Sequence, residues 1–204
     1  MQVLNKVRDF LTRHSIRNCS ILVALSGGTD STALINLLLE LREEFSLELS
    51  IAHLDHCLRG EASEKDAQFV RSKAEEMGLK ATISKREVNR FVGEDNRSLE
   101  EAAREVRYEF LSETADAQGV DYVALGHNKN DQAETVLMNI IRGAGLRGLG
   151  GMQEVKGRYI RPLLNLKRDE IRNYIEARGL DYRRDETNKN TDFLRNRVRQ
   201  VLIP

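Results

Sequence analysis

Six consecutive residues combine hydroxyl, glycine and carboxylate groups in a pattern suited to binding a phosphate. They are Ser26, Gly27, Gly28, Thr29, Asp30 and Ser31. The apolar run 21–25 before them predicts a buried strand, and leucines at helical spacing after them predict a helix. Backbone N–H groups at a helix start attract anions, and glycine lets the backbone approach a phosphate closely. The carboxylate of Asp30 would repel a phosphate unless a cation lay between them, so we expect Mg²⁺ there.

The alternative for this turn is an ordinary connection between a strand and a helix. A Walker A loop is excluded, because its lysine and its spacing are missing.

A second polar group begins with Gly126 and His127 at the end of a predicted strand and continues into a predicted helix. Asp131 and Glu134 share a helix face with Thr135, because they are three and four residues apart. Carboxylates in a first turn also favour the helix dipole without any ligand. The functional interpretation is an acidic pocket for a cation, either Mg²⁺ or an ammonium group. His127 would act as a general acid or base, or donate to a phosphate.

The third candidate group follows a predicted strand over 47–54. Strand alternation puts His53 and Asp55 on one side and His56 on the other. No further ligand-rich motif completes a tetrahedral metal site, so nucleotide contacts are favoured over structural zinc. Arg59 would then bring a guanidinium group near substrate phosphates.

Arginines form the last two candidate groups. A predicted helix over 98–118 carries Glu101, Arg104 and Tyr108 on one face, with Arg107 adjacent, and ordinary solvated ion pairing is the alternative. The late segment is basic and is also compatible with a plain surface helix. Its arginines are Arg195, Arg197 and Arg199.

The elements that position these groups alternate between strands and helices. Strands are expected at 21–25, 47–54, 80–84 and 121–125, with an extended piece at 159–163. Helices are expected at 2–13, from the glycine turn to about 45, from a capping box at Ser63 to 77, at 98–118, 130–141 and 167–178, and near the C-terminal end. This order predicts a doubly wound α/β fold with a parallel sheet. Its ligands bind beyond the carboxyl ends of the strands, where the polar groups fall, so we expect one composite active site.

Composition limits the class of protein. Lysine plus arginine and aspartate plus glutamate each number 32 among 204 residues, but residues 142–199 hold 15 basic and 8 acidic ones, which favours a basic face. No apolar run approaches the roughly 20 residues that span a bilayer, and no signal pattern opens the chain. Cys19, before the first predicted strand, and Cys57 are the only cysteines, so the cytoplasm is expected. The glycine-rich segment 143–151 reads as a loop.

Taken in order, the motifs resemble one family. The chain is similar to the N-terminal catalytic domain of the tRNA(Ile)-lysidine synthetases, within the PP-loop group of ATP pyrophosphatases. The resemblance rests on residues 26–31, 53–56 with 58–60, 101–104 with 107–108, 126–127 with 131–135, 142–145, 161–164, 185–188 and 195–199. It implies a single Rossmann-like PP-loop domain over 1–204, with a core at about 15–145 and a loop and helical extension at about 143–204. The C-terminal tRNA-binding domains of many family members would be absent.

The resemblance also implies a reaction. ATP adenylates the C2 carbonyl oxygen of the wobble cytidine in an isoleucine tRNA with a CAU anticodon, and pyrophosphate leaves. The amine of L-lysine then displaces AMP and forms lysidine. The implied partners are therefore ATP, Mg²⁺, tRNA and lysine, without a membrane; the oligomeric state, including a homodimer, is left open.

Residue roles follow from the same resemblance. The implied catalytic residues are Asp30, His127, Asp131, Glu134, Arg104 and Arg107. The implied ATP-binding residues are Ser26, Gly27, Gly28, Thr29, Asp30, Ser31, His53, Asp55, Arg59 and Gly126. Asp131 and Glu134 would bind lysine, and Asp30 and Asp131 would bind the metal. The implied tRNA-binding residues are Arg142, Arg161, Arg195, Arg197 and Arg199.

One position departs from the family pattern, and three alternatives remain. Asn130 stands where the family usually has an acid, which puts one charge of the metal or lysine site in doubt. A tRNA thiolase of the same fold would need closely spaced cysteines, whereas Cys19 and Cys57 are 38 positions apart. A small-molecule synthetase would leave the basic segment without a role, and a nucleotide-binding sensor would release no pyrophosphate.

Overall fold

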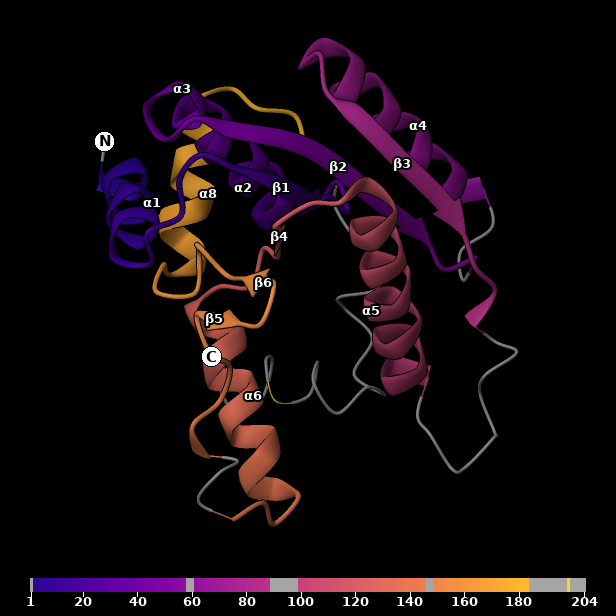
Figure 1. Cartoon of the computed structure of the whole chain (residues 1–204). Coiled ribbons are helices and arrows are strands. Elements are labelled where there is room, and N and C mark those ends of the chain that lie inside the picture. The colour runs from indigo at the N-terminus through magenta and orange to yellow at the C-terminus, as the bar shows by residue number, and fades with distance from the viewer. Residues whose placement is uncertain (1, 58–60, 89–98, 146–148, 184–197, 199–204) are drawn as a thin grey trace.

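The computed structural model describes residues 2–57, 61–88, 99–145, 149–183 and 198, and it has a six-stranded sheet at its centre (Figure 1). The strand order is β3-β2-β1-β4-β6-β5, and all neighbours are parallel except β5 and β6. The strands are β1 (Cys19–Ala24), β2 (Leu47–Asp55), β3 (Lys80–Lys85), β4 (Tyr122–Ala124), β5 (Val155–Lys156) and β6 (Tyr159–Ile160). The predicted doubly wound α/β class is confirmed.

Helices cover both faces of this sheet. They are α1 (Gln2–Arg13), α2 (Thr29–Glu40), α3 (Arg42–Phe45), α4 (Glu61–Glu76), α5 (Leu99–Gln118), α6 (Lys129–Ile141) and α8 (Arg168–Ala177). Alternate residues of β1 explain the layers: Ile21 and Val23 pack with α1, α2, α4 and α8, whereas Leu22 packs with Phe110 and Leu111 of α5. Helix α6 extends away from the sheet (Figure 1).

The chain reverses its direction across the sheet at β1. Strand β2 lies on one side of β1 and is reached through α2, whereas β4 lies on the other side and follows α5. A crevice forms at such a reversal, outside the carboxyl ends of the strands. Residues that follow β1, β2 and β4 are therefore brought together there.

Several element boundaries differ from the prediction. The helix expected to reach residue 45 divides at Leu41 into α2 and α3. The capping box predicted at Ser63 is wrong: α4 already begins at Glu61, and Ser63 is buried within its first turn, because Glu61 and Ala62 are good helix formers. Cys19 is the first residue of β1 and does not precede it.

Strand β5 was not expected, because two residues are too few to show an alternating pattern. The polar loop at 90–97, the capping residue Ser98 and the last predicted helix lie outside the described residues, apart from Val198. Within the described part, no helix is both long enough and apolar enough to span a bilayer.

Candidate active site

The conformation of the glycine turn between β1 and α2 is fixed by hydrogen bonds among its own residues. Gly27 has a φ of +84°, a conformation that glycine adopts without strain. Ser31 Oγ donates to the Gly28 carbonyl at 3.0 Å and accepts the Ser26 N–H at 3.2 Å. Gly28 is the N-cap of α2 and offers no side chain to the first-turn N–H groups. The turn therefore presents a helix N-terminus whose backbone donors face a prospective anion.

Gly126 brings the second polar group against this turn. A Cβ at Gly126 would lie 3.2 Å from Ser31 N and 3.3 Å from the carbonyl carbon of Asp30. The chain leaving β4 therefore passes so close to the first turn of α2 that a side chain would displace it. Two predicted groups that are about a hundred residues apart in sequence meet here.

His53 lies at the carboxyl end of β2 and is 5% exposed. Its Nδ1 is 2.8 Å from the Leu25 carbonyl oxygen. Because a carbonyl only accepts, Nδ1 carries the proton and Nε2 is left as an acceptor. Nε2 is buried and finds no hydrogen-bond partner among the described residues. A ligand hydroxyl or amino group would satisfy it.

Asp55, expected beside His53, is also buried, but its carboxylate has a local structural partner. Its Oδ1 accepts the Cys57 N–H at 2.7 Å, and Cys57 has a φ of +55°. Asp55 thus closes the turn that ends β2. Arg59 lies outside the described residues.

Helix α6 begins with a capping box that the sequence analysis did not identify. Asn128 Oδ1 accepts the Asp131 N–H at 3.0 Å, and Asp131 Oδ2 accepts the Asn128 N–H at 3.0 Å. Asn128 and Asp131 have the spacing of this motif, so a signal for it was present in the sequence. The N-cap makes α6 start at Lys129, one residue earlier than expected.

Arg168 is the site residue that sequence reasoning missed. Its Nη2 lies 3.6 Å from Asp131 Oδ1 and 3.4 Å from Glu134 Oε1, and Glu134 is 1% exposed. Asn130 accepts the Arg168 N–H at 3.1 Å, so the starts of α6 and α8 are joined. The local sequence does not predict this pairing, because Arg168 is 34 residues beyond Glu134. The predicted shared face of Asp131 and Glu134 is confirmed.

The arginines of α5 surround a tyrosine. Arg104 stacks on the Tyr108 ring, with Cζ 4.9 Å from its centroid, and Arg107 approaches the same ring at 5.9 Å. Arg142 forms an ion pair with Glu101 at 3.3 Å. Cation–π stacking of this kind holds planar guanidinium groups in fixed orientations.

The remaining predicted tRNA contacts fall in different environments. Arg161 is 4% exposed, and its guanidinium donates to the Gln153 carbonyl at 2.9 Å and to the Tyr108 hydroxyl at 3.4 Å. In this arrangement Arg161 orients Tyr108 and does not face a surface ligand. Arg195, Arg197 and Arg199 lie outside the described residues.

Among the residues that the structure describes, no group of three histidine, cysteine or acidic side chains is arranged to hold a metal ion. Mg²⁺ is commonly held by one or two carboxylates together with substrate phosphates. The position of Asp30 in the first turn of α2, beside the glycine turn, fits that mode of binding.

The chain is similar to curated proteins over nearly its whole length. tRNA(Ile)-lysidine synthase from Geobacter sulfurreducens is 45% identical over 206 residues, covering 99% of this chain and 44% of the relative. The enzyme of the same name from Clostridium perfringens is 43% identical over 202 residues, covering 98% of this chain and 43% of the relative. The chain thus spans less than half the length of these curated relatives.

Solved structures support the fold alone. A U34-tRNA thiolase from Methanococcus maripaludis, solved with its [4Fe-4S] cluster, superposes with a TM-score of 0.76 at 23% identity, over 90% of this chain and 65% of that one. An NH₃-dependent NAD synthetase from Campylobacter jejuni superposes with a TM-score of 0.55 at 16% identity, over 98% of this chain and 86% of that one. The profile of the family described as PP-loop domain matches residues 2–204, and the chain therefore belongs to the PP-loop domain family.

Proposed function

We propose that this chain catalyses the ATP-dependent ligation of lysine to C2 of the wobble cytidine in an isoleucine tRNA with a CAU anticodon. The reaction passes through an adenylated cytidine and releases pyrophosphate and AMP. The observation that carries the proposal is the contact of Gly126 with the first turn of α2, which joins a phosphate-binding turn to an acidic helix start. The likeness to lysidine synthases over 98–99% of the chain supports the choice of this reaction.

ATP binds with its phosphates on the glycine turn. The backbone amides of Gly28 and Thr29 and the hydroxyls of Ser26 and Ser31 supply donors for the departing pyrophosphate. Buried Nε2 of His53 accepts a hydrogen bond from the nucleoside part. His127, next to Gly126, donates to a phosphate or transfers the proton. Mg²⁺, held by Asp30 and the phosphates, would neutralise charge on the leaving group.

Lysine binds through its ammonium group to Asp131 and Glu134. The guanidinium of Arg168 already lies within 3.6 Å of both carboxylates, so this pair accepts a cation in the chain itself. The two carboxylates and this guanidinium together carry one net negative charge, which a single ammonium group balances and a divalent ion would exceed. We therefore assign Asp131 to the amine and leave Asp30 as the metal ligand.

The tRNA is held by arginines. Arg104 and Arg107, oriented on Tyr108, stabilise the phosphates or the cytidine, which must be splayed into the pocket. Arg142, Arg195, Arg197 and Arg199 neutralise the anticodon backbone. The buried Arg161 contributes by orienting Tyr108.

The cysteines argue against sulfur transfer, which is the alternative of the same fold. Cys19 begins β1 and Cys57 follows β2, so they stand at opposite ends of two parallel strands. Burial raises the pKa of each thiol, with further contributions from Asp121 for Cys19 and Asp55 for Cys57. A raised pKa reduces the thiolate fraction that sulfur chemistry requires.

Pyrophosphate release from ATP tests the proposal, with tRNA and lysine omitted in turn. Lysidine synthesis predicts release with tRNA alone and the modified nucleoside only with both. Release that depends on lysine but not on tRNA would contradict it, and so would incorporation of labelled sulfur into tRNA.

A further inference from the structure

The short segment that follows α8, residues 180–183, is ion-paired with α4 and reaches the glycine turn; we name it the strap. The N–H of Arg183 donates to the Gly27 carbonyl at 2.8 Å. The Thr32 hydroxyl donates to the same oxygen at 3.3 Å. The Gly27 carbonyl is therefore held between the strap and the helix that it precedes.

This contact fixes the direction of the neighbouring amide. In a trans peptide the carbonyl oxygen and the following N–H point in opposite directions. Since the Gly27 oxygen is held toward Arg183 and Thr32, the Gly28 N–H is turned the other way, toward the Ser26 hydroxyl at 3.4 Å. That side of the turn is the one on which a phosphate would meet the N-terminus of α2.

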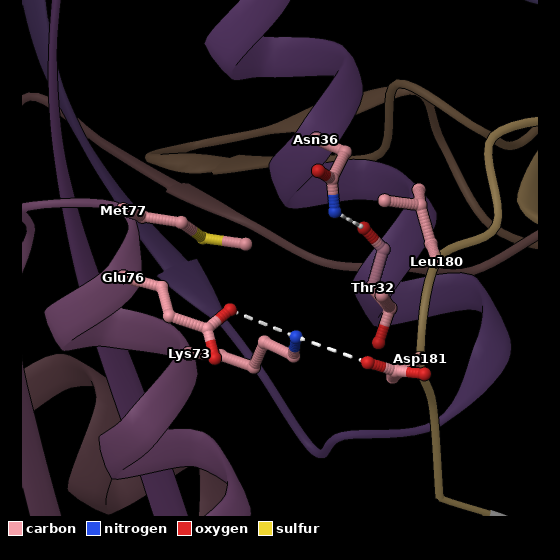
Figure 2. Close-up of a pocket in the computed structure, with 7 residues that line it drawn as sticks. All are labelled: Thr32, Asn36, Lys73, Glu76, Met77, Leu180 and Asp181. Atoms are coloured by element: carbon pink, nitrogen blue, oxygen red, sulfur yellow. Dashed lines mark hydrogen bonds and ion pairs between the residues drawn. The ribbon is translucent and has the colours of Figure 1, made fainter.

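The strap is held by ion pairs with α4. Arg183 Nε donates to Asp66 Oδ1 at 2.9 Å, and the Asp66 side chain is only 14% exposed. Lys73 lies between Glu76 of its own helix, at 2.9 Å, and Asp181 of the strap, at 3.4 Å (Figure 2). A cavity of about 200 Å³ separates the strap from α2 and α4 at this point, so apolar packing there is incomplete.

The glycine turn is enclosed by the same two elements. A Cβ at Gly27 would lie 3.3 Å from the Phe69 ring of α4 and 3.5 Å from Cγ of Arg183. Phe69 of α4 and Arg183 of the strap thus both border Gly27 closely, on the side where a Cβ would lie.

We propose that Arg183 and Asp66 are positioning residues for the triphosphate: their ion pair holds the strap so that its backbone orients the Gly28 amide toward the phosphates. The inference rests on the proposed function only in assuming that the glycine turn binds the phosphates of ATP. In this proposal the strap contacts neither lysine nor tRNA.

Equilibrium binding of Mg·ATP and of AMP to the whole 204-residue chain tests this role, with thermal unfolding measured in parallel. Asp66→Asn and Arg183→Gln should weaken ATP binding about three- to tenfold, which is the net scale of losing one ordinary hydrogen bond. AMP lacks the β- and γ-phosphates, so its affinity should change less than twofold. Arg183→Lys keeps a charge for Asp66 and should retain most of the ATP affinity.

Arg183→Pro removes the backbone donor itself and should weaken ATP binding about tenfold or more. Glu64→Gln is the matched control, because Glu64 lies on the same helix as Asp66 but forms its ion pair with Lys85 of β3, at 3.0 Å, and not with the strap. It should leave both affinities unchanged.

Two results would overturn the inference. One is unchanged ATP affinity in Asp66→Asn and Arg183→Gln. The other is an equal loss of ATP and AMP affinity, which indicates general disruption of the fold. If the unmodified chain binds no ATP, the proposed function fails first, and that failure is recognised without any variant.

Discussion

Close contacts at Gly126 and His53 shape the candidate site. At Gly126 the space for a side chain is taken up by the backbone of Asp30 and Ser31. At His53 a hydrogen bond to Leu25 fixes the tautomer and leaves one buried acceptor for a ligand. The sequence identified Gly126 and His53 as candidate site residues. Their contacts in the fold explain why a glycine and a histidine stand at these positions.

Gly126→Ala should separate activity from stability. The added Cβ, 3.2 Å from Ser31 N, must push the first turn of α2 outward by a few tenths of an ångström. Misplaced phosphate donors should lower kcat/KM for ATP by about tenfold, with a small change in Tm. Steady-state pyrophosphate release and thermal unfolding measure the two effects. Gly145→Ala, where a Cβ would meet nothing within 4 Å, is the control. Equal losses in both variants would argue against the role given to Gly126.

Asp131→Asn tests the assignment of lysine. Asparagine can still accept the Asn128 N–H, so the cap of α6 and the Tm should be largely kept. Loss of the carboxylate charge should raise KM for lysine about tenfold or more and leave tRNA-dependent pyrophosphate release nearly unchanged. Asp169→Asn, which alters an exposed acid of α8, controls for net charge. A rise in KM for ATP would instead place Asp131 at the metal.

At the scale of elements, α8 connects several parts of the protein. It packs on α1 and α2, its start is joined to α6 through Asn130, and the strap follows its end. Tyr174 contributes a hydrogen bond to Glu40 of α2, and burial together with that bond raises the pKa of the Tyr174 hydroxyl. The helix therefore links the N-terminal helix to both polar groups of the site.

The Glu170 carboxylate makes this connection sensitive to acid. The Lys6 ammonium, and then the Lys167 amide, lower the pKa of Glu170 below its ordinary value. A lowered folded-state pKa stabilises the fold at pH values above the ordinary glutamate pKa, and that contribution is lost as pH falls through the lowered value.

Glu170→Gln should therefore lower Tm at pH 7 by about 3 °C, corresponding to about 1 kcal/mol for a helix cap and a partly exposed ion pair. The difference from the unmodified chain should shrink below pH about 4, where the Glu170 carboxyl becomes protonated first in the unfolded and then in the folded chain. Thermal unfolding at a series of pH values measures it. A difference that stays constant down to pH about 2.5 would show that charge at Glu170 is not the cause.

At the scale of the whole molecule, charge is unevenly distributed along a chain with no net charge. The basic excess over residues 142–199 begins at Arg142, at the end of α6, where Glu101 pairs with it. An acidic body with a basic region would let an RNA backbone approach from one side.

Arg142→Gln should weaken tRNA binding and reduce its dependence on salt. If Arg142 contacts a phosphate, the slope of log K against log salt should fall by about 1. Filter binding between about 50 and 200 mM salt measures the slope. Arg172→Gln, on the exposed face of α8, is the comparison and should leave the slope unchanged. An unaltered slope in Arg142→Gln would exclude a phosphate contact at that residue.

The sequence by itself determined the fold class, the alternation of strands and helices, and the glycine turn at the start of α2. These features depend on short-range periodicity and on residues next to one another in the chain. The shared face of Asp131 and Glu134 was likewise readable, because helical spacing fixes it.

Only the tertiary structure decided which distant groups come together. Arg168 beside the acidic pair, Arg161 buried against Tyr108, Gly126 on the first turn of α2 and the strap on Gly27 all join segments separated by long stretches of chain. Such pairs arise from how helices pack across a sheet, and no local pattern encodes the partner. The identity of a reactive group is thus local, whereas its electrostatic environment depends on the whole fold.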